Sequence, residues 1–208
     1  MTDVFALPEP EDLVQLRAQI AQLDALPDAP ADEVAAAESD ESAAAATAFH
    51  GGGDDAACFA YRYSFALAAG TLAGSFWETL KLKAAEAHRF VDVIEQCAVV
   101  ERPALGLVRD IVVRGVGADW MSSGWDGPPA GVEVRATERV FVDEEARTIL
   151  YRERTDRFVC MNALVAQEGG RFAMRGTYIY PVKRSRAAFL ETNARLFAQL
   201  EKHASAAE

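Results

Sequence analysis

Apolar and polar positions alternate through most of residues 58–182, and alternation with a period of two is the pattern of β-strands. Seven runs of this kind follow one another: 58–67, 91–102, 105–115, 132–143, 147–154, 156–167 and 171–182. Most neighbouring runs are separated by short turn signals, such as Gly169 and Gly170 before the last run. Consecutive strands joined by tight turns pair antiparallel, so the sequence predicts a seven-stranded antiparallel sheet.

Residues 75–90, between the first two runs, predict two short helices. Ser75 has the position of an N-cap, and Glu78 completes a capping box with it. The pattern assigns an apolar face to Phe76, Trp77 and Leu80 and a solvated face to Lys81, Lys83 and Glu86. We therefore interpret this segment as scaffold that closes one end of the sheet.

Residues 185–204 form a long amphipathic pattern whose apolar stripe contains one polar residue. The stripe consists of Phe189, Asn193, Leu196, Phe197 and Leu200. A single helix with one apolar stripe must cover one face of the sheet. The predicted fold class is α+β: a curved seven-stranded antiparallel sheet wrapped around a long C-terminal helix, with two short helices after the first strand. We expect a small-molecule cavity between the sheet and this helix.

The first 56 residues differ from the rest of the chain. Leu13, Leu16, Ile20 and Leu23 are spaced 3, 4 and 3 residues apart, which predicts a short helix within residues 9–25. The remainder is rich in Ala, acidic residues and Gly, a composition typical of a largely disordered tether. We therefore divide the chain into a tail, residues 1–56, and a folded domain, residues 57–204. The short helix is either dispensable or a docking segment for a partner protein or a second copy in a homodimer.

The acidity of the chain is concentrated in the tail. Residues 1–50 hold eleven acidic residues and one basic residue, so they account for −10 of the formal net charge of −11, and the body, at −1, is nearly balanced. A balanced body without a Lys/Arg run argues against nucleic acid and anionic membranes as partners. No apolar run reaches the length of a membrane span, and the N-terminus lacks a signal-peptide pattern. We expect a cytoplasmic protein.

Conventional metal and cofactor signatures are missing from the sequence. His50, His88 and His203 lie far apart in different predicted segments, and no metal-ligand or dinucleotide motif is present. The three cysteines are isolated within apolar stretches, which favours buried thiols in a reducing compartment over a disulfide. We expect neither a metal nor a cofactor.

The order of elements over residues 58–203 resembles the helix-grip fold of the START/polyketide-cyclase (SRPBCC) superfamily, which includes the birch-pollen allergen. Within it, "FWETLKLKA", "FVDVIEQCAVVE" and "GLVRDIVV" resemble the AtaL-like group. The matching positions are Trp77, Leu80, Lys83-Ala84, Phe90, Cys97 and Val100-Glu101. The loop over residues 115–131 is longer than the turn expected there, and it is either a lid over the cavity mouth or a tolerated insertion.

The resemblance implies a hydrophobic or aromatic small molecule bound in the cavity. It also implies cofactor-independent cyclisation, dehydration or isomerisation of a polyketide-like metabolite. The alternative is a non-catalytic carrier or receptor that acts through a protein partner, and a third reading is a structural module whose interior is filled by side chains.

Polar residues at positions where the pattern favours apolar ones are the candidates for chemistry, because burying them is unfavourable without partners. Arg109 alternates with apolar residues on one strand and either faces inward, where it would bind a carboxylate or enolate, or lies on the solvated face. Tyr178 is either a cavity hydroxyl or a core residue, and the pattern favours the core. Asn193 is either a hydrogen-bonding group in the cavity or a cap for a neighbouring backbone group.

If the protein is an enzyme, we expect Arg109 and Tyr178 to act on the substrate, with Asn193 helping to orient it. Gly176 leaves room for a ligand or for the helix backbone. The full set of expected ligand-lining residues is Trp77, Arg109, Trp120, Trp125, Met174, Gly176, Tyr178, Phe189, Asn193 and Phe197. The remaining charged residues of the strands are expected to form cross-strand ion pairs on the outer face: Arg152, Arg157 and Arg175 with Glu133, Glu138 and Glu153.

Overall fold

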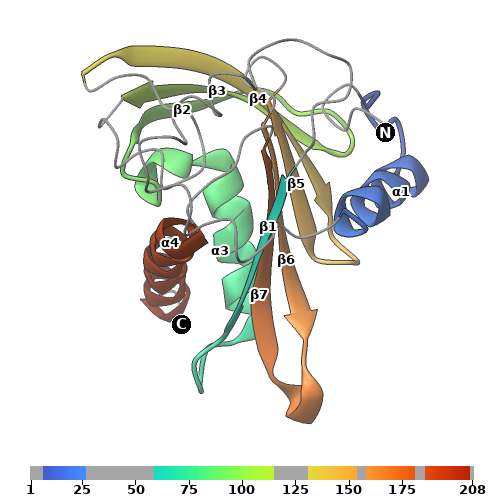
Figure 1. Cartoon of the computed structure of the whole chain (residues 1–208), viewed down its shortest axis with the longest axis vertical. Coiled ribbons are helices and arrows are strands. Elements are labelled where there is room, and N and C mark those ends of the chain that lie inside the picture. Colours follow the sequence, from blue (N-terminus) through green and yellow to red (C-terminus); the bar gives the residue numbers. More distant parts are fainter. Residues whose placement is uncertain (1–6, 27–58, 115–130, 154–157, 181–185, 207–208) are drawn as a thin grey trace, which may run out of the picture.

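The computed structural model describes residues 7–26, 59–114, 131–153, 158–180 and 186–206 (Figure 1). Its strands are β1 (Phe59–Ala66), β2 (Ile94–Glu101), β3 (Gly106–Arg114), β4 (Glu133–Asp143), β5 (Thr148–Glu153), β6 (Phe158–Ala166) and β7 (Phe172–Tyr180). They form one seven-stranded sheet in the order β1-β7-β6-β5-β4-β3-β2. Every neighbouring pair is antiparallel, which confirms the predicted sheet.

Two turns show why the hairpins close where the sequence places them. Gly169 and Gly170, between β6 and β7, have φ angles of 74° and 73°. Gly106 begins β3 with a φ of 152°, and a Cβ there would lie 2.1 Å from the carbonyl oxygen of Val140. Only glycine fits this close approach between β3 and β4.

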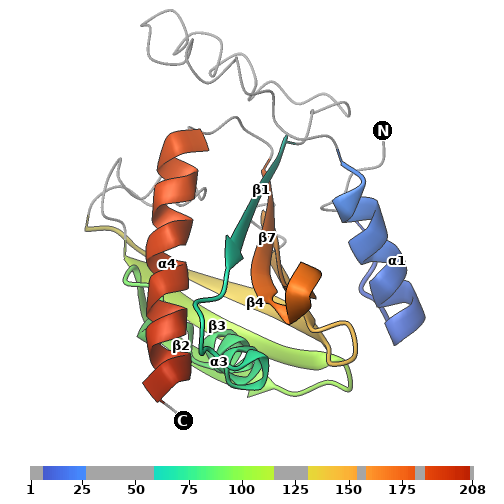
Figure 2. The same ribbon diagram turned by 90° about the horizontal axis from the view of Figure 1, so that it is seen from below.

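The helices are α1 (Leu13–Asp24), α3 (Ala73–Ala85), a 3-10 turn η2 (Ala87–Arg89) and α4 (Arg186–Ala206). Figures 1 and 2 show α3 and α4 on one side of the sheet and α1 on the other. We call the side that faces α3 and α4 the inner face. The apolar stripe of α4 packs there, as predicted from its spacing, with Phe189, Phe197 and Leu200 buried.

The start of α3 differs from the predicted capping box. The helix begins at Ala73, and Leu72 is its N-cap in extended conformation without a side-chain cap. Ser75 therefore lies inside the helix, where its carbonyl oxygen accepts a hydrogen bond of 3.0 Å from the Thr79 hydroxyl. The capping-box prediction is wrong because the small residues Ala73 and Gly74 extend the helix upstream.

The predicted N-terminal helix is present as α1, and it packs against the outer face of the sheet. Leu16 and Leu23 are 0% and 2% exposed and lie in one apolar cluster with residues of β4, β5, β6 and β7. The Arg17 guanidinium donates to the buried Asp143 carboxylate at the end of β4, with Nη2 to Oδ1 at 2.9 Å. The predicted tether, residues 27–56, lies outside the described residues.

Two arginines on the outer face of the sheet bind the C-terminal end of α1. Arg62 donates to the carbonyl oxygens of Leu23, Asp24 and Leu26 at the C-terminal end of α1. Such donors satisfy the carbonyls that a helix end leaves without partners. Arg175 pairs with the Asp24 carboxylate at 2.8 Å instead of with a neighbouring strand, so the cross-strand prediction is wrong for this residue.

Candidate functional site

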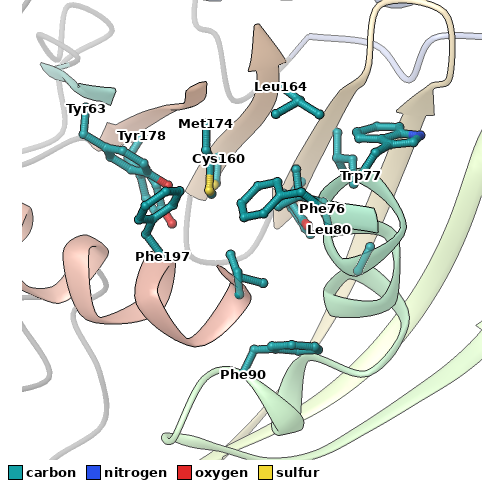
Figure 3. Close-up of a cluster of buried hydrophobic side chains, with 14 of the residues drawn as sticks. Tyr63, Phe76, Trp77, Leu80, Phe90, Cys160, Leu164, Met174, Tyr178 and Phe197 are labelled. Atoms are coloured by element: carbon teal, nitrogen blue, oxygen red, sulfur yellow. The ribbon is translucent and has the colours of Figure 1, made fainter. Parts of the chain in front are cut away.

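The inner face of the sheet and the helices α3 and α4 enclose the largest hydrophobic cluster of the described residues. Figure 3 shows Tyr63, Tyr178 and Phe197 on one side of this interior and the α3 residues Phe76 and Leu80 on the other. The sulfur atoms of Met174 and Cys160 lie between the two groups. Most of the walls are therefore aromatic or aliphatic, and the polar groups among them stand out.

Lys83 is the clearest of these polar groups. It projects from α3, is 5% exposed, and its Nζ donates to Oδ1 of Asn162 on β6 at 2.7 Å. The same ammonium group lies 4.7 Å from the ring centroid of Tyr151 on β5. The prediction that Lys83 lies on the solvated side of its helix is wrong.

A chain of polar side chains continues from Asn162 across the sheet. The Asn162 amide Nδ2 lies 3.4 Å from the hydroxyl of Tyr63 on β1. Tyr178 on β7 is within hydrogen-bonding reach of both the Tyr63 hydroxyl and the Cys160 thiol. We call Lys83, Asn162, Tyr63, Tyr178 and Cys160 the interior polar chain.

Beside this chain, Arg109 and Glu138 form a buried ion pair. Arg109 is 3% exposed and Glu138 is 5% exposed, and the Arg109 Nε donates to Glu138 Oε2 at 2.6 Å. The Arg109 Nη1 donates to the carbonyl oxygens of Lys83 and Ala84 at 3.1 and 2.7 Å. Of the two orientations that the sequence left open for Arg109, the structure shows the inward one. Its contacts fix the last turn of α3 and so position Lys83.

The predicted position of Glu138 on the outer face is wrong. Glu138 was predicted to form a cross-strand pair there, but its partner Arg109 is its register neighbour on the inner face. Arg157, from the same predicted set, lies outside the described residues.

The environment shifts the pKa values of the interior groups apart. Burial lowers the pKa of Lys83 to about 8; the Arg109 cation acts in the same direction, and Cys160 and Glu138 oppose it. Burial raises the pKa of the Tyr63 and Tyr151 hydroxyls well above the ordinary value and that of the Cys160 thiol to about 11. Near neutral pH the amine is therefore the group closest to changing its protonation state, while the phenols remain neutral donors.

The side chain of Tyr151 is a second indication of a functional site. It is 2% exposed, and its hydroxyl has no hydrogen-bond partner within the described part of the chain. Arg109 stacks over the ring of Tyr151 at 5.1 Å, and Lys83 lies over the same ring. A buried hydroxyl without a partner is uncommon in native proteins and calls for a group that would pair with it.

The predicted ligand-lining residues of β7 and α4 lie in this interior. Met174, Tyr178, Phe189 and Phe197 all belong to the main cluster. The space that Gly176 leaves is filled by the ring of Tyr63, whose Cζ would lie 2.1 Å from a Cβ at that position.

Asn193 and Trp77 are buried but bonded to protein groups. The Asn193 amide donates to the carbonyl oxygen of Phe189, four residues earlier on α4, at 2.8 Å. The Trp77 indole donates to Glu144 Oε2 at 2.8 Å, in the turn between β4 and β5. The other two tryptophans of the predicted site, Trp120 and Trp125, lie outside the described residues.

The sequence contained a signal for Lys83 that the capping-box interpretation obscured. Phe76, Leu80, Lys83 and Ala87 are spaced 4, 3 and 4 residues apart, so Lys83 continues the apolar face of its helix. Asn162 likewise alternates with Cys160 and Leu164 on β6. Their mutual contact could not be read from the sequence because it joins positions 79 residues apart.

A protein-family model described as "AtaL: Acetylaranotin biosynthesis cluster protein L" matches residues 73–208, well over half of the chain. The chain belongs to the AtaL family. This AtaL-family match includes α3 with Lys83 and every strand after β1, whereas α1 and β1 precede it. No protein with a curated description matches the sequence.

Solved structures confirm the helix-grip fold. TTHA0849 from Thermus thermophilus aligns with a TM-score of 0.52 at 15% identity, over 72% of this chain and 99% of that chain. The Zhui aromatase/cyclase from Streptomyces sp. R1128 aligns with a TM-score of 0.50 at 16% identity, over 72% and 94%. Ara h 8.0201 aligns with a TM-score of 0.51 at 10% identity, over 72% and 99%. At these identities the likeness establishes the fold alone.

No group of three or more His, Cys, Asp or Glu side chains within the described residues is arranged to hold a metal ion. None of the described helices has the length and apolarity of a membrane span.

Proposed function

We propose that this protein binds a hydrophobic or aromatic small molecule between the inner face of the sheet and α4. We further propose that the interior polar chain moves protons on that molecule, in a cofactor-independent cyclisation, dehydration or isomerisation. The observation that carries the proposal is the interior polar chain, which links the buried amine of Lys83 to two buried phenols through Asn162.

Stability alone does not explain the position of these groups, because burying them lowers the free energy of unfolding. A lysine loses its hydration when it is buried, and an apolar side chain of similar size would fill the same space without this cost. Among the described residues, Lys83 makes one hydrogen bond and lies over one ring, which compensates only part of the loss. Retaining a charge-bearing group under such conditions is typical of functional sites.

The groups also form a suitable acid–base pair. Proton transfer is most efficient when the base has a pKa near the working pH, and Lys83 has a pKa of about 8. The Tyr63 hydroxyl, whose pKa is raised by burial, keeps its proton and can donate a hydrogen bond to a developing oxyanion. The family description and the aromatase/cyclase among the structural neighbours support small-molecule metabolism as the setting.

The test combines ligand identification with turnover. Native mass spectrometry of the protein purified from its source cells would detect a bound small molecule, and extracts of those cells would be incubated with the protein and screened for compounds consumed and formed. We expect wild type to convert the bound class of compound. We expect Lys83→Met and Tyr63→Phe to retain binding and lose turnover by about 10²-fold or more.

Lys81→Met is the matched control, because Lys81 lies on the same helix but pairs with Glu78 and Glu144 at the surface. Its turnover should equal that of wild type. Binding without conversion by wild type would contradict the catalytic part and leave a carrier or receptor. A protein that binds no apolar compound from the extract would contradict the whole proposal.

A further inference from the structure

Lys83 differs from an ordinary structural lysine in its partners. Its Nζ can donate three hydrogen bonds and makes one within the described part of the chain, to Asn162 Oδ1 at 2.7 Å. Across the described residues, no carboxylate lies within ion-pair distance of it. Lys81, two residues earlier, contacts the carboxylates of Glu78 and Glu144 at 2.9 and 3.1 Å. The amine of Lys83 can therefore form further hydrogen bonds in an apolar interior.

Burial and the neighbouring Arg109 cation disfavour the protonated form of this amine. Arg109 from β3 holds a second cation over the same Tyr151 ring, at 5.1 Å, while Glu138 from β4 is bonded to Arg109. Cys160 from β6 and Glu138 act in the opposite direction, and burial outweighs them. Desolvation next to another cation is the known physical route by which a protein makes a lysine amine nucleophilic.

The second nucleophile in the interior is not activated. Burial raises the pKa of the Cys160 thiol to about 11, so at neutral pH it remains a thiol, which is a poor nucleophile. The Tyr151 hydroxyl has no partner among the described residues, and the Tyr151 ring lies beside the Lys83 amine, so this hydroxyl is a donor for an oxygen atom of a bound molecule.

We propose that Lys83 condenses with an aldehyde or ketone carbonyl of the bound hydrophobic molecule to form an imine. This inference rests on the proposed function, since the molecule must first enter the interior, and it narrows the substrate class to apolar carbonyl compounds. The nitrogen lone pair forms the C–N bond while the π bond of the carbonyl breaks, and one amine proton moves to the carbonyl oxygen, giving a neutral carbinolamine. The second amine proton then moves to that oxygen, the C–O bond breaks, water leaves and the C=N bond forms.

The condensation needs no oxidant or reductant, and hydrolysis reverses it. A protonated imine withdraws electrons from the adjacent carbon and makes its C–H bonds acidic. Ring closure and dehydration at that carbon are the reactions that such activation favours, in agreement with the proposed function.

Reductive trapping tests the inference. The full-length protein would be incubated at pH 8 with a small excess of benzoylacetone, a hydrophobic β-diketone, or 2-naphthaldehyde, together with sodium cyanoborohydride, which reduces an imine to a stable secondary amine. Peptide mapping by mass spectrometry then compares all lysines of the same sample. We expect modification of Lys83 at least 10-fold faster than of Lys81, and 2-methylnaphthalene, which has no carbonyl, should slow modification at Lys83 alone.

Lys83→Arg should abolish this fast modification, and Lys81→Arg should leave it unchanged. The comparison among lysines within wild type stands even if a variant fails to fold. Binding of 2-methylnaphthalene, followed by intrinsic fluorescence, separates the two proposals. If it binds while Lys83 reacts no faster than Lys81, the imine inference is wrong and the binding proposal stands. If it does not bind and Lys83 is not modified, both are wrong.

Discussion

At the scale of single residues, Tyr63 and Gly176 depend on each other. They are register partners on β1 and β7, and the Tyr63 ring lies where a side chain at position 176 would be. The ring is confined by Phe65 at 4.9 Å and Phe189 at 5.9 Å between centroids, so it cannot move aside freely. Because Gly176 has no side chain, it leaves the space in which the Tyr63 ring places its hydroxyl next to Asn162.

Replacing Gly176 with Ala should lower the free energy of unfolding by about 1–3 kcal/mol, the range for overpacking a core. A Cβ at this position would lie 2.1 Å from Tyr63 Cζ, so the ring must shift. Gly74→Ala is the control, because nothing lies within 4 Å of a Cβ there and alanine favours the helix. Urea denaturation of both variants checks the prediction, and equal stability of the two would contradict it.

Lys83 makes stability depend on pH in a defined direction. Its folded pKa of about 8 lies below the ordinary value of 10.5, so the folded state disfavours the ammonium form. Below pH 8 this penalty is fully present. Between pH 8 and 10.5 the unfolded chain binds a proton that the folded chain lacks, so the free energy of unfolding rises with pH.

The difference in stability between wild type and Lys83→Met should therefore shift in favour of wild type by about 2 kcal/mol from pH 7 to pH 9.5. The difference cancels the contributions of the tyrosines and other groups. Urea denaturation of both proteins at the two pH values measures it. Parallel pH dependence of wild type and variant would show that Lys83 titrates as a solvated lysine.

At the scale of elements, α1 closes the outer face of the sheet although it lies before the family match. Its contacts combine the buried Leu16 and Leu23 with the ion pair between Arg17 and Asp143. The Arg17 hydrogen bond lowers the pKa of Asp143, so this contribution to stability is present at neutral pH and is lost as the pH falls below about 4.

Leu16→Ala should destabilise the protein by about 2–5 kcal/mol, as expected for a fully buried leucine. Val14 on the same helix is 77% exposed, and Val14→Ala should change stability by no more than about 0.5 kcal/mol. Hydrogen exchange of the α1 amides locates the effect. Unchanged protection of α1 in Leu16→Ala would mean that the helix is held by its arginine contacts alone.

The strands and α4 could be predicted from the sequence because their signal is local: a period of two in the strands, and a stripe at helical spacing in α4. The inward orientation of Arg109 could not, since Val108 and Val112 on the other side of β3 are buried as well and the alternation fits both registers. The packing of α1 was equally hidden, because Arg17 and Asp143 are 126 positions apart.

Part of the interior could be predicted from the sequence, but its clearest polar group, Lys83, could not. Tyr178, Met174 and Phe189 were assigned to the interior from their faces on β7 and α4. Lys83 was assigned to solvent because charged residues on a short helix are usually exposed. Its burial depends on Asn162 and Tyr151, two positions on other strands that no local pattern connects with α3.

At the scale of the whole molecule, the sheet separates two buried environments. Met174 lies on the inner face among the aromatic residues near α4, and Met161 lies on the outer face under α1. They are 0% and 3% exposed, so both are core residues on neighbouring strands. We propose that a ligand enters only the inner environment.

Methyl NMR of protein labelled at the methionine methyl groups tests this claim most directly, with 2-naphthol and benzoylacetone as probes. We predict that both compounds shift the Met174 methyl resonance and give intermolecular contacts to it, while the Met161 resonance stays unchanged. Titration that leaves Met174 unchanged, or that moves Met161 equally, would contradict the proposal of a ligand site between the sheet and α4.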